Sequence, residues 1–351
     1  MRVLFVSNYP HLPEIHGGLQ TTTHDLCLAI KALGAEAAVL CGRLHADGRH
    51  GAADCDEQLG YLVMRADDPE RNLAMAAAAW NASIIVVQSG TTLLPMIVSS
   101  LATGRPTAVY LHNVEVHQLA GTLVPDPSLL YLANSRFTAE RWRALSGIEC
   151  CIVPPVVDPE DYLAASAGDK VLFVNPSPIK GVEILFSLAA QCPDIPFLVG
   201  ESWNLDPYWR EHCMRRAHAL GNIEWQAPTR DMRAFYAQGR MLLMPSVWEE
   251  SFGRTVLEAQ LNGLPVLASN RGALQDLVGG GGLALDPHAP LEEWTLALRQ
   301  LYASPQPCAD IGRHQAMTHV ASTPLIVGNM LTALALHASA NSPASAPLRQ
   351  G

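Results

Sequence analysis

The chain has 351 residues, more than one hydrophobic core usually supports, so two domains are expected. Hydrophobic residues make up 49% and charged residues 16%, a composition that indicates a globular protein and excludes a disordered one. Acidic residues outnumber basic ones by 33 to 23, for a formal net charge of −10, and this balance argues against nucleic acid as a partner.

The first half of the chain alternates short apolar runs with helical patterns. Strands are expected at RVLFVS (2–7), AEAAVL (35–40), YLVM (61–64), SIIVVQS (83–89), PTAVYLH (106–112), LLYLAN (129–134) and CCIVPP (150–155). Helices are expected at 19–33, 71–80, 92–102 and 135–145. Strands that are apolar on both faces and separated by helices predict a parallel sheet covered on both sides, as in a doubly wound, Rossmann-like domain.

A stretch rich in Pro, Asp, Ala and Ser, residues 156–169, interrupts this pattern and predicts a linker. Further strands are expected at KVLFVNP (170–176), PFLVG (196–200), NIEW (222–225), RMLLMPS (240–246), LPVLAS (264–269) and GGLALDP (281–287). We therefore expect an α/β protein with two Rossmann-like doubly wound domains facing across a cleft, where ligands of open α/β sheets bind.

The domain boundaries follow from these patterns. The N-terminal domain is expected at 1–163 and the C-terminal domain at 164–322. Residues 323–340 are expected to form a helix that packs back toward the N-terminal domain, and residues 341–351 a mobile tail.

Cysteine spacing and the lengths of apolar runs indicate the cellular compartment of the protein. The eight cysteines have no C-x-x-C spacing and no paired framework, so we expect reduced thiols in the cytoplasm. The N-terminal apolar run is too short for a signal peptide, and no transmembrane segment is expected elsewhere. Peripheral membrane attachment stays open, and the oligomeric state is not indicated.

Two glycines, Gly17 and Gly18, end the first long loop and directly precede a predicted helix. Such a pair permits close approach of a ligand to the helix N-terminus, although a tight turn would explain it equally well. The loop is neither a G-x-G-x-x-G fingerprint nor a P-loop, which argues against nicotinamide binding and ATP hydrolysis.

His112 stands at the end of a predicted strand. An imidazole there can donate to a ligand hydroxyl or stabilise charge in a transition state. Its spacing to Glu115 and His117 fits no strong metal motif, so no metal site is expected and His117 is interpreted as structural.

Two loops of the second half each place a basic residue at a predicted helix start: Lys180, followed by Gly181, and Arg254, preceded by Gly253. A cation in the first turn opposes the helix dipole unless an anion lies nearby. Two such starts in one domain predict one shared anion with more than one negative charge, such as a diphosphate.

The polar residues beside these two helix starts have two interpretations each, one as ligand-binding residues and one as structural residues. Glu250 and Glu258 bracket the Arg254 start, where they either hold ligand hydroxyls or serve as a cap and a solvated helix residue. Asn175 and Ser177, before Lys180, are either hydrogen-bond donors or turn residues.

Together these loops resemble those of retaining glycosyltransferases of the GT-B fold, specifically glycosyltransferase family 4, or glycosyl transferases group 1. The resemblance covers nearly the whole chain. It rests on the Gly17-Gly18 loop, on LFVNPSPIKGVEIL, and on MPSVWEESFGRTVLEAQLNGLPVLAS, which matches the family's E-x7-E element followed by a Gly-x-Pro-Val strand.

The resemblance implies a hexosyltransferase that moves a sugar from a nucleotide-diphosphate donor, with a UDP-sugar as first expectation, to an acceptor hydroxyl with retention. The donor would lie mainly on the C-terminal domain. The acceptor, a saccharide, lipid-linked glycan or small molecule, would lie mainly on the N-terminal one. No cofactor is implied, and no bound metal is implied because protein cations neutralise the diphosphate.

Residue roles are implied by position. Glu258 would bind the ribose, Glu250 the donor sugar hydroxyls, and Lys180 the diphosphate, while His112 would lie beside the anomeric carbon. Gly17 and Gly18 would lie against the phosphate. The implied donor site is completed by Asn175, Gly181, Ser251, Phe252, Gly253, Arg254 and Thr255.

The chain departs from the family at Asn175, where an arginine commonly stands five residues before the loop lysine. Because a charge-assisted contact is stronger than a neutral one, Lys180 and Arg254 would carry more of the phosphate binding. Two alternatives stay open: a sugar-nucleotide epimerase of the same fold, and a non-catalytic partner that binds a nucleotide sugar. Asn175 slightly favours the partner, whereas Glu250, Glu258 and Lys180 oppose it.

Overall fold

The computed structural model describes residues 1–44, 53–90, 92–165, 168–201, 205–229 and 231–341. The chain forms two compact units, Met1–Val156 with Thr323–Gly351, and Val157–Ser322. The first boundary therefore comes earlier than the expected residue 163, because Val157 and Tyr162 are buried in the core of the second unit. Of the expected mobile tail, residues 342–351 lie outside the described residues.

The first unit contains an eight-stranded sheet in the order β3-β4-β2-β1-β5-β6-β7-β8. Its strands are β1 (Arg2–Pro10), β2 (Glu36–Gly42), β3 (Asp54–Asp56), β4 (Leu62–Arg65), β5 (Ile84–Gln88), β6 (Thr107–Leu111), β7 (Leu129–Ala133) and β8 (Cys151–Ile152). Every pairing is parallel except that of β3 with β4. Strand β3 is not among the expected strands, because its acidic Asp-Cys-Asp contains no apolar run.

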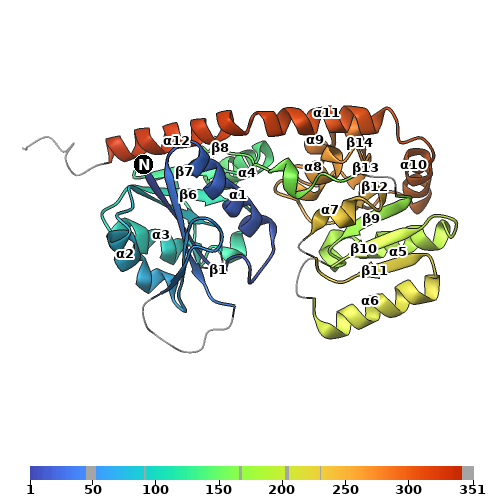
Figure 1. Ribbon diagram of the computed structural model, residues 1–351, viewed down its shortest axis with the longest axis horizontal. Helices are drawn as coiled ribbons and strands as arrows, with labels where there is room; N and C mark the ends of the chain where they lie inside the picture. The colour runs from blue at the N-terminus through green and yellow to red at the C-terminus, as the bar shows by residue number, and fades with distance from the viewer. Residues whose placement is uncertain (45–52, 91, 166–167, 202–204, 230, 342–351) are drawn as a thin grey trace, which may run out of the picture. The chain divides into compact units, whose positions relative to one another are not determined.

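Helices cover both faces of this sheet, as Figure 1 shows. They are α1 (Gly18–Ala32), α2 (Pro69–Ala79), α3 (Leu93–Ala102), α4 (Arg136–Ser146) and α12 (Thr323–Ala340), with a 3₁₀ turn η1 (Val116–Gln118). Alternate residues of β1 enter opposite cores, since Leu4 joins one cluster of buried side chains and Phe5 the other. Strand β1 is thus buried on both faces, as expected in the middle of a parallel sheet.

Helix α12 returns to the first unit and lies beside α1 (Figure 1). Its Val327, Met330 and Leu334 are buried in the same cluster as Phe5 and Leu26. No transmembrane segment is expected from the sequence, but α12, with 18 residues, is long and apolar enough to cross a membrane by length and composition alone. This is weak evidence for a span, because core helices meet the same test.

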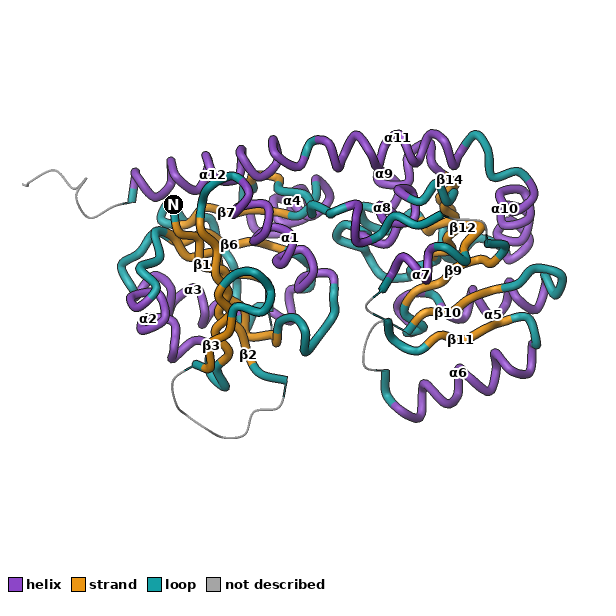
Figure 2. The backbone as a smooth tube through the Cα atoms, in the orientation of Figure 1, coloured by secondary structure: helices purple, strands orange, loops and turns teal. Residues whose placement is uncertain are grey.

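The second unit contains a six-stranded, wholly parallel sheet in the order β11-β10-β9-β12-β13-β14. Its strands are β9 (Lys170–Val174), β10 (Phe197–Gly200), β11 (Ile223–Gln226), β12 (Gly239–Met244), β13 (Val266–Ser269) and β14 (Gly282–Leu285). Figure 2 shows these strands among the helices that cover them. The helices are α5 (Val182–Gln191), α6 (Pro207–Leu220), α7 (Met232–Tyr236), α8 (Arg254–Leu261), α9 (Leu274–Val278), α10 (Leu291–Ala303) and α11 (Cys308–Ala321).

The strand order of the second unit reverses between β9 and β12. From β9 the chain proceeds outward to β10 and β11, and then returns to form β12 on the other side of β9. The loops that leave the carboxyl ends of β9 and β12 therefore diverge from neighbouring positions. In open α/β sheets this is where ligands bind. In the first unit the corresponding reversal lies between β1 and β5.

Candidate functional site

The loops after β9 and β12 are joined through their backbones. The carbonyl oxygen of Ile179 accepts hydrogen bonds from the backbone N–H groups of Val247, at 3.0 Å, and Trp248, at 3.2 Å. Gly181 has a φ of +80°, and a Cβ there would lie 1.9 Å from the Pro245 carbonyl oxygen. Glycine is therefore required at this position by both its conformation and the closeness of the neighbouring loop.

Lys180 and Glu250 meet where these two loops join. The Lys180 Nζ lies 2.5 Å from Glu250 Oε1, and the two side chains are only 17% and 10% exposed. Ser246 Oγ donates to the same oxygen at 2.6 Å. No hydrogen bond from the described residues reaches Glu250 Oε2. One carboxylate oxygen is thus fixed by two donors, and the other remains available as an acceptor.

The backbone of Glu250 is fixed as well. Its carbonyl oxygen accepts from the backbone N–H of Ala273 at 2.8 Å. Gly272 has a φ of +64°, and a Cβ there would lie 2.1 Å from the same carbonyl oxygen. Ser269 Oγ in turn donates to the Ser246 carbonyl oxygen at 2.5 Å. The end of β13 and the turn after it therefore hold the loop that carries Glu250.

Arg254 and Glu258 form a second buried pair, on the first turns of α8. Gly253, with a φ of +100°, precedes the helix, and Arg254 Nε donates to Glu258 Oε1 at 3.2 Å. The Tyr236 hydroxyl donates to Glu258 Oε2 at 2.8 Å, and Arg254 Nη2 donates to the Tyr162 hydroxyl at 3.1 Å. Burial, followed by the Glu258 charge, raises the pKa of Tyr236 well above its usual value. Both oxygens of Glu258 therefore have partners inside the unit.

These two ion pairs remove the reason for expecting a diphosphate at the two helix starts. Lys180 ends a short 3₁₀ turn, η3 (Pro178–Lys180), and α5 begins only at Val182. Arg254 does begin α8, but its carboxylate partner stands one turn along the same helix. Each cation is already neutralised by a glutamate, so neither needs an anionic ligand to offset the helix dipole.

The remaining expected donor-site residues of the second unit lie on the same two loops or, for Thr255, in the first turn of α8. Phe252 is buried in the core of the second unit, and Thr255 Oγ1 contacts Met244 Sδ at 3.3 Å. Ser251 stands between Glu250 and Phe252 and is partly buried. Asn175 is 3% exposed, has a φ of +66°, and directly follows β9. The fold thus brings the donor set of the second unit to one edge of its sheet.

The first unit holds the other three expected residues. Gly17 precedes α1 in an extended conformation, with a φ of −130°, and a Cβ on Gly18 would meet nothing within 4 Å. The Gly17 backbone therefore does not require glycine, and Gly18 has room for a side chain. Gly17 ends the loop that leaves β1 and Gly18 begins α1, beside the reversal of strand order in this unit.

His112 directly follows β6 and is 8% exposed. Its backbone N–H donates to Ser89 Oγ at 2.9 Å, and its carbonyl oxygen accepts from Asn134 Nδ2 at 3.2 Å. The Tyr110 ring lies against the imidazole, with 4.0 Å between ring centroids. Burial lowers the pKa of His112 to about 3, so the imidazole is neutral near pH 7. Its Nε2 atom is buried and has no hydrogen-bond partner.

Several residues that the sequence analysis did not select belong to this network. Ser246 and Tyr236 bind the two glutamates, Tyr162 binds Arg254, and Gly272 allows the close approach to Glu250. Ser246 is the last residue of a predicted strand and stands four positions before Glu250, which was a usable signal. Tyr162 and Tyr236 lie in unremarkable sequence, and only the fold shows their role.

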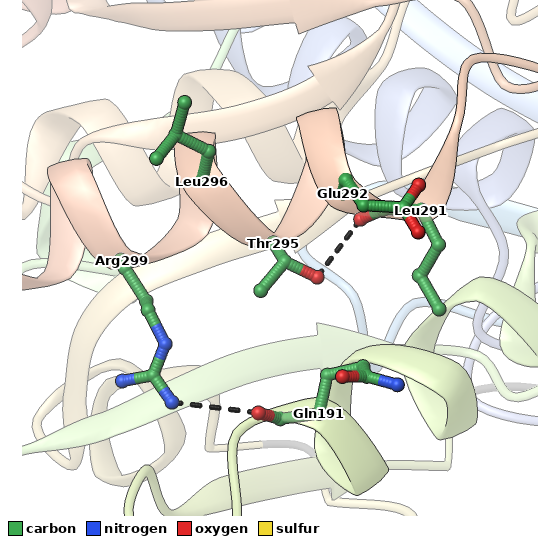
Figure 3. A pocket seen from close by; sticks show the side chains of 6 residues that line it. All are labelled: Gln191, Leu291, Glu292, Thr295, Leu296 and Arg299. Atoms are coloured by element: carbon green, nitrogen blue, oxygen red, sulfur yellow. Dashed lines mark hydrogen bonds between the residues drawn. The ribbon is translucent and has the colours of Figure 1, made fainter.

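Two surface hollows lie apart from these residues. One, of about 200 Å³, is lined by residues of α5 and α10, shown in Figure 3: Gln191, Leu291, Glu292, Thr295, Leu296 and Arg299. The other, of about 570 Å³, lies in the first unit and includes Arg2 and Arg105. Neither contains an expected site residue. In the described part of the chain, no group of three or more His, Cys, Asp or Glu side chains is arranged to hold a metal ion.

The family model that matches this chain falls within the second unit. Residues 168–304 match the family model described as Glycosyl transferases group 1. A D-inositol 3-phosphate glycosyltransferase of Paenarthrobacter aurescens is 38% identical over 94 residues, 26% of this chain and 22% of the relative. One from Segniliparus rotundus is 33% identical over 189 residues, 46% of this chain and 41% of the relative. The aligned segments thus span less than half the length of these relatives.

Comparison with solved structures covers both units. Sucrose-phosphate synthase of Thermosynechococcus elongatus matches with a TM-score of 0.76 at 14% identity, over 95% of this chain and 99% of that one. The Anabaena protein HepE, in complex with UDP and glucose, matches with a TM-score of 0.75 at 17% identity, over 94% and 99%. At these identities the likeness shows the fold alone, and it confirms the predicted class of two α/β units with parallel sheets.

Proposed function

Because residues 168–304 form a glycosyl transferases group 1 domain in a chain with the GT-B fold, we propose that the protein is a hexosyltransferase. It moves a sugar from a nucleotide-diphosphate donor to an acceptor hydroxyl. The observation that carries the proposal is the Lys180–Glu250 pair, which lies in the matched segment at the strand-order reversal of the sheet. A UDP-sugar is the first donor to test, since the similar HepE structure holds UDP and glucose.

In this proposal the Lys180–Glu250 pair spans the donor. An ammonium group has three N–H donors, so Lys180 contacts the diphosphate while it keeps its bond to Glu250. Glu250 Oε2 accepts from a hydroxyl of the donor sugar. Arg254 and the first N–H groups of α8 add positive potential for the phosphates. Glu258 supports Arg254 and, on the ligand side, the ribose.

The reaction we propose retains the anomeric configuration. The anomeric C–O bond breaks with its electron pair going to the diphosphate, and the acceptor oxygen bonds to the same carbon from the same face. The acceptor proton passes to the departing diphosphate oxygen. Lys180 and Arg254 stabilise the charge that develops on the leaving group. Glu250 and neutral His112 orient the sugar and do not form a covalent intermediate.

The first unit, with Gly17 and Gly18 in the loop after β1, contributes to the phosphate side of the donor and holds the acceptor. We place the activity in the cytoplasm, with no cofactor and with a saccharide, a lipid-linked glycan or a small molecule as acceptor.

The test is a panel of nucleotide sugars incubated with the pure protein, with and without candidate acceptors. Nucleoside diphosphate should be released, and the release should depend on an acceptor that gains the sugar. Release coupled to an altered sugar, without an acceptor, would identify an epimerase instead. Tight binding of a nucleotide sugar without release under any condition would identify a non-catalytic binding partner.

A further inference from the structure

Three polar atoms in the loop after β9 are buried without a hydrogen-bond partner. They are Asn175 Oδ1, Asn175 Nδ2 and Ser177 Oγ. Native proteins leave few buried polar atoms unpaired, and an amide unpaired at both ends beside an unpaired hydroxyl is a concentrated exception. The three atoms lie at the carboxyl end of β9, in the loop that leads to Lys180.

The Asn175 side chain is not what holds its own turn. The Asn175 backbone N–H donates to the Gly200 carbonyl oxygen at 2.8 Å, and its carbonyl oxygen accepts from the Ser177 N–H at 2.8 Å. Its φ of +66° lies in the left-handed region, where glycine is the least strained residue. The turn would therefore form at least as well without an amide, and burial of an amide that makes no hydrogen bond is a cost to the folded protein.

The types of the unpaired atoms indicate the chemistry of a ligand. The amide presents both a donor and an acceptor, and the hydroxyl can act as either. Ionised phosphate oxygens only accept, so a phosphate facing Asn175 would leave Oδ1 unpaired. A sugar hydroxyl both donates and accepts, and a pair of neighbouring hydroxyls satisfies both ends of the amide.

The charges nearby are consistent with an uncharged ligand group. Lys180 is paired with Glu250 at 2.5 Å, and Arg254 is paired with Glu258 at 3.2 Å. Asn175 and Ser177 are themselves neutral. Each cation has a carboxylate partner, so charge alone does not favour a phosphate over a hydroxyl group at the amide, while the other N–H groups of Lys180 still serve the diphosphate.

We propose that Asn175 and Ser177 form a subsite for the hydroxyl groups of the donor sugar, and not for its phosphates. The inference rests on the proposed function and names the part of the donor that this loop binds. It replaces the expectation that position 175 faces the diphosphate. Because Asn175 is 3% exposed, the sugar reaches it only after neighbouring side chains turn aside.

The test uses two variants and one matched control. Asn175→Gly keeps the left-handed backbone and removes the amide, and Ser177→Ala removes the hydroxyl. Asn81→Gly is the control, because Asn81 also has a positive φ, +53°, but lies on an exposed turn of the first unit. Calorimetric titrations with UDP, UDP-glucose, GDP and GDP-mannose measure binding, and thermal unfolding of the ligand-free proteins measures stability.

The expected result is selective. Each variant should bind the nucleotide sugar about threefold to tenfold more weakly than the wild type, the effect of one or two lost neutral hydrogen bonds. Binding of the matching nucleoside diphosphate should not change. The ligand-free Asn175→Gly protein should melt at a higher temperature than the wild type, because two unpaired buried atoms are gone, and Asn81→Gly should leave both binding constants as they were.

Three results would overturn the inference while leaving the proposed function in place. Equal losses for the diphosphate and the nucleotide sugar would assign the loop to phosphate. Unchanged binding in both variants would assign it to the scaffold. A melting temperature lowered by Asn175→Gly but not by Asn81→Gly would show that the amide supports the fold. If the wild type binds none of the four probes, the proposed donor class and the inference fail together.

Discussion

Lys180 and Glu250 are 70 positions apart in the chain, yet the ammonium nitrogen and a carboxylate oxygen lie 2.5 Å apart. They meet because β9 and β12 are hydrogen-bonded neighbours and both residues stand in the loops that follow these strands. Lys170, at the opposite end of β9, makes a pair of the same length with Glu224, and its side chain is also 17% exposed. The second unit therefore contains a matched pair away from the candidate site.

The first prediction compares these two lysine–glutamate pairs. Lys180→Ala should weaken nucleoside diphosphate binding by about tenfold to a hundredfold, because a charged hydrogen bond at a partly buried site is worth roughly 1.5 to 3 kcal/mol. Binding of the nucleoside alone should barely change. Lys170→Ala should bind both ligands as the wild type does. Calorimetric titration of the three proteins checks this, and wild-type affinity in Lys180→Ala would show that the diphosphate lies elsewhere.

Substitutions of Glu250 and Glu258 should have different effects. Glu250→Gln should lower kcat by roughly a hundredfold or more, because it removes the charge that orients the donor sugar while Lys180 and Ser246 keep the loop in place. Glu258→Gln should mainly weaken nucleotide binding and should lower the free energy of unfolding by about 1 to 3 kcal/mol, since Arg254 then lacks its buried carboxylate. Steady-state kinetics with urea denaturation measures both. Small and equal effects on kcat would return both residues to a structural role.

The joined loops can be tested through a glycine. Gly181→Ala should lower the free energy of unfolding by about 2 to 5 kcal/mol, because the new Cβ meets the Pro245 carbonyl as well as an unfavourable backbone region. Gly221→Ala is the control, with a φ of +78° and no atom within 4 Å of the added Cβ. It should cost only about 1 to 2 kcal/mol. Equal costs in urea denaturation would mean that the loops are not in close backbone contact.

His112 predicts a pH dependence of stability. Its folded pKa of about 3 is below the usual 6.5, so the folded protein keeps it neutral where the unfolded chain binds a proton. Stability should therefore fall as the pH drops below about 6.5, by up to about 1.4 kcal/mol per pH unit from this residue. His112→Gln should lose that contribution, so its unfolding free energy should fall less steeply.

The comparison isolates His112 from other buried histidines. The pKa of His11 is also lowered to about 3 by burial, but His11 is present in both proteins and its contribution cancels in the difference. Denaturation curves at several pH values between 7 and 4.5 give the two profiles. Parallel profiles would contradict a buried neutral imidazole at position 112.

The last prediction concerns metal. Transfer should survive a chelator, because Lys180 and Arg254 supply the positive charge that a divalent cation would otherwise bring to the diphosphate. Turnover measured with and without EDTA should agree within error. Complete loss that magnesium or manganese restores would show that the two cations, each paired with a glutamate, do not neutralise the leaving group by themselves.

The sequence alone determined the layers of the fold. Apolar runs such as 170–176 and 240–246 indicate strands buried on both faces, because a strand covered on both sides of a parallel sheet has consecutive apolar residues. The same pattern placed His112 at a strand end, and Lys180 and Glu250 in segments between a predicted strand and the next helix. Loops at the carboxyl ends of strands carry ligand sites in this architecture, so residue type and position were enough to select them.

Tertiary structure decided which residues touch. The sequence predicted an anionic ligand beside Lys180 and Arg254. In the fold each of these cations forms an ion pair with a glutamate, and the Tyr236 hydroxyl donates a hydrogen bond to Glu258. It also left Asn175 without a hydrogen-bond partner for either end of its amide. Periodicity records how deeply a residue is buried but not its neighbour across the sheet, because strand order joins segments far apart in the chain.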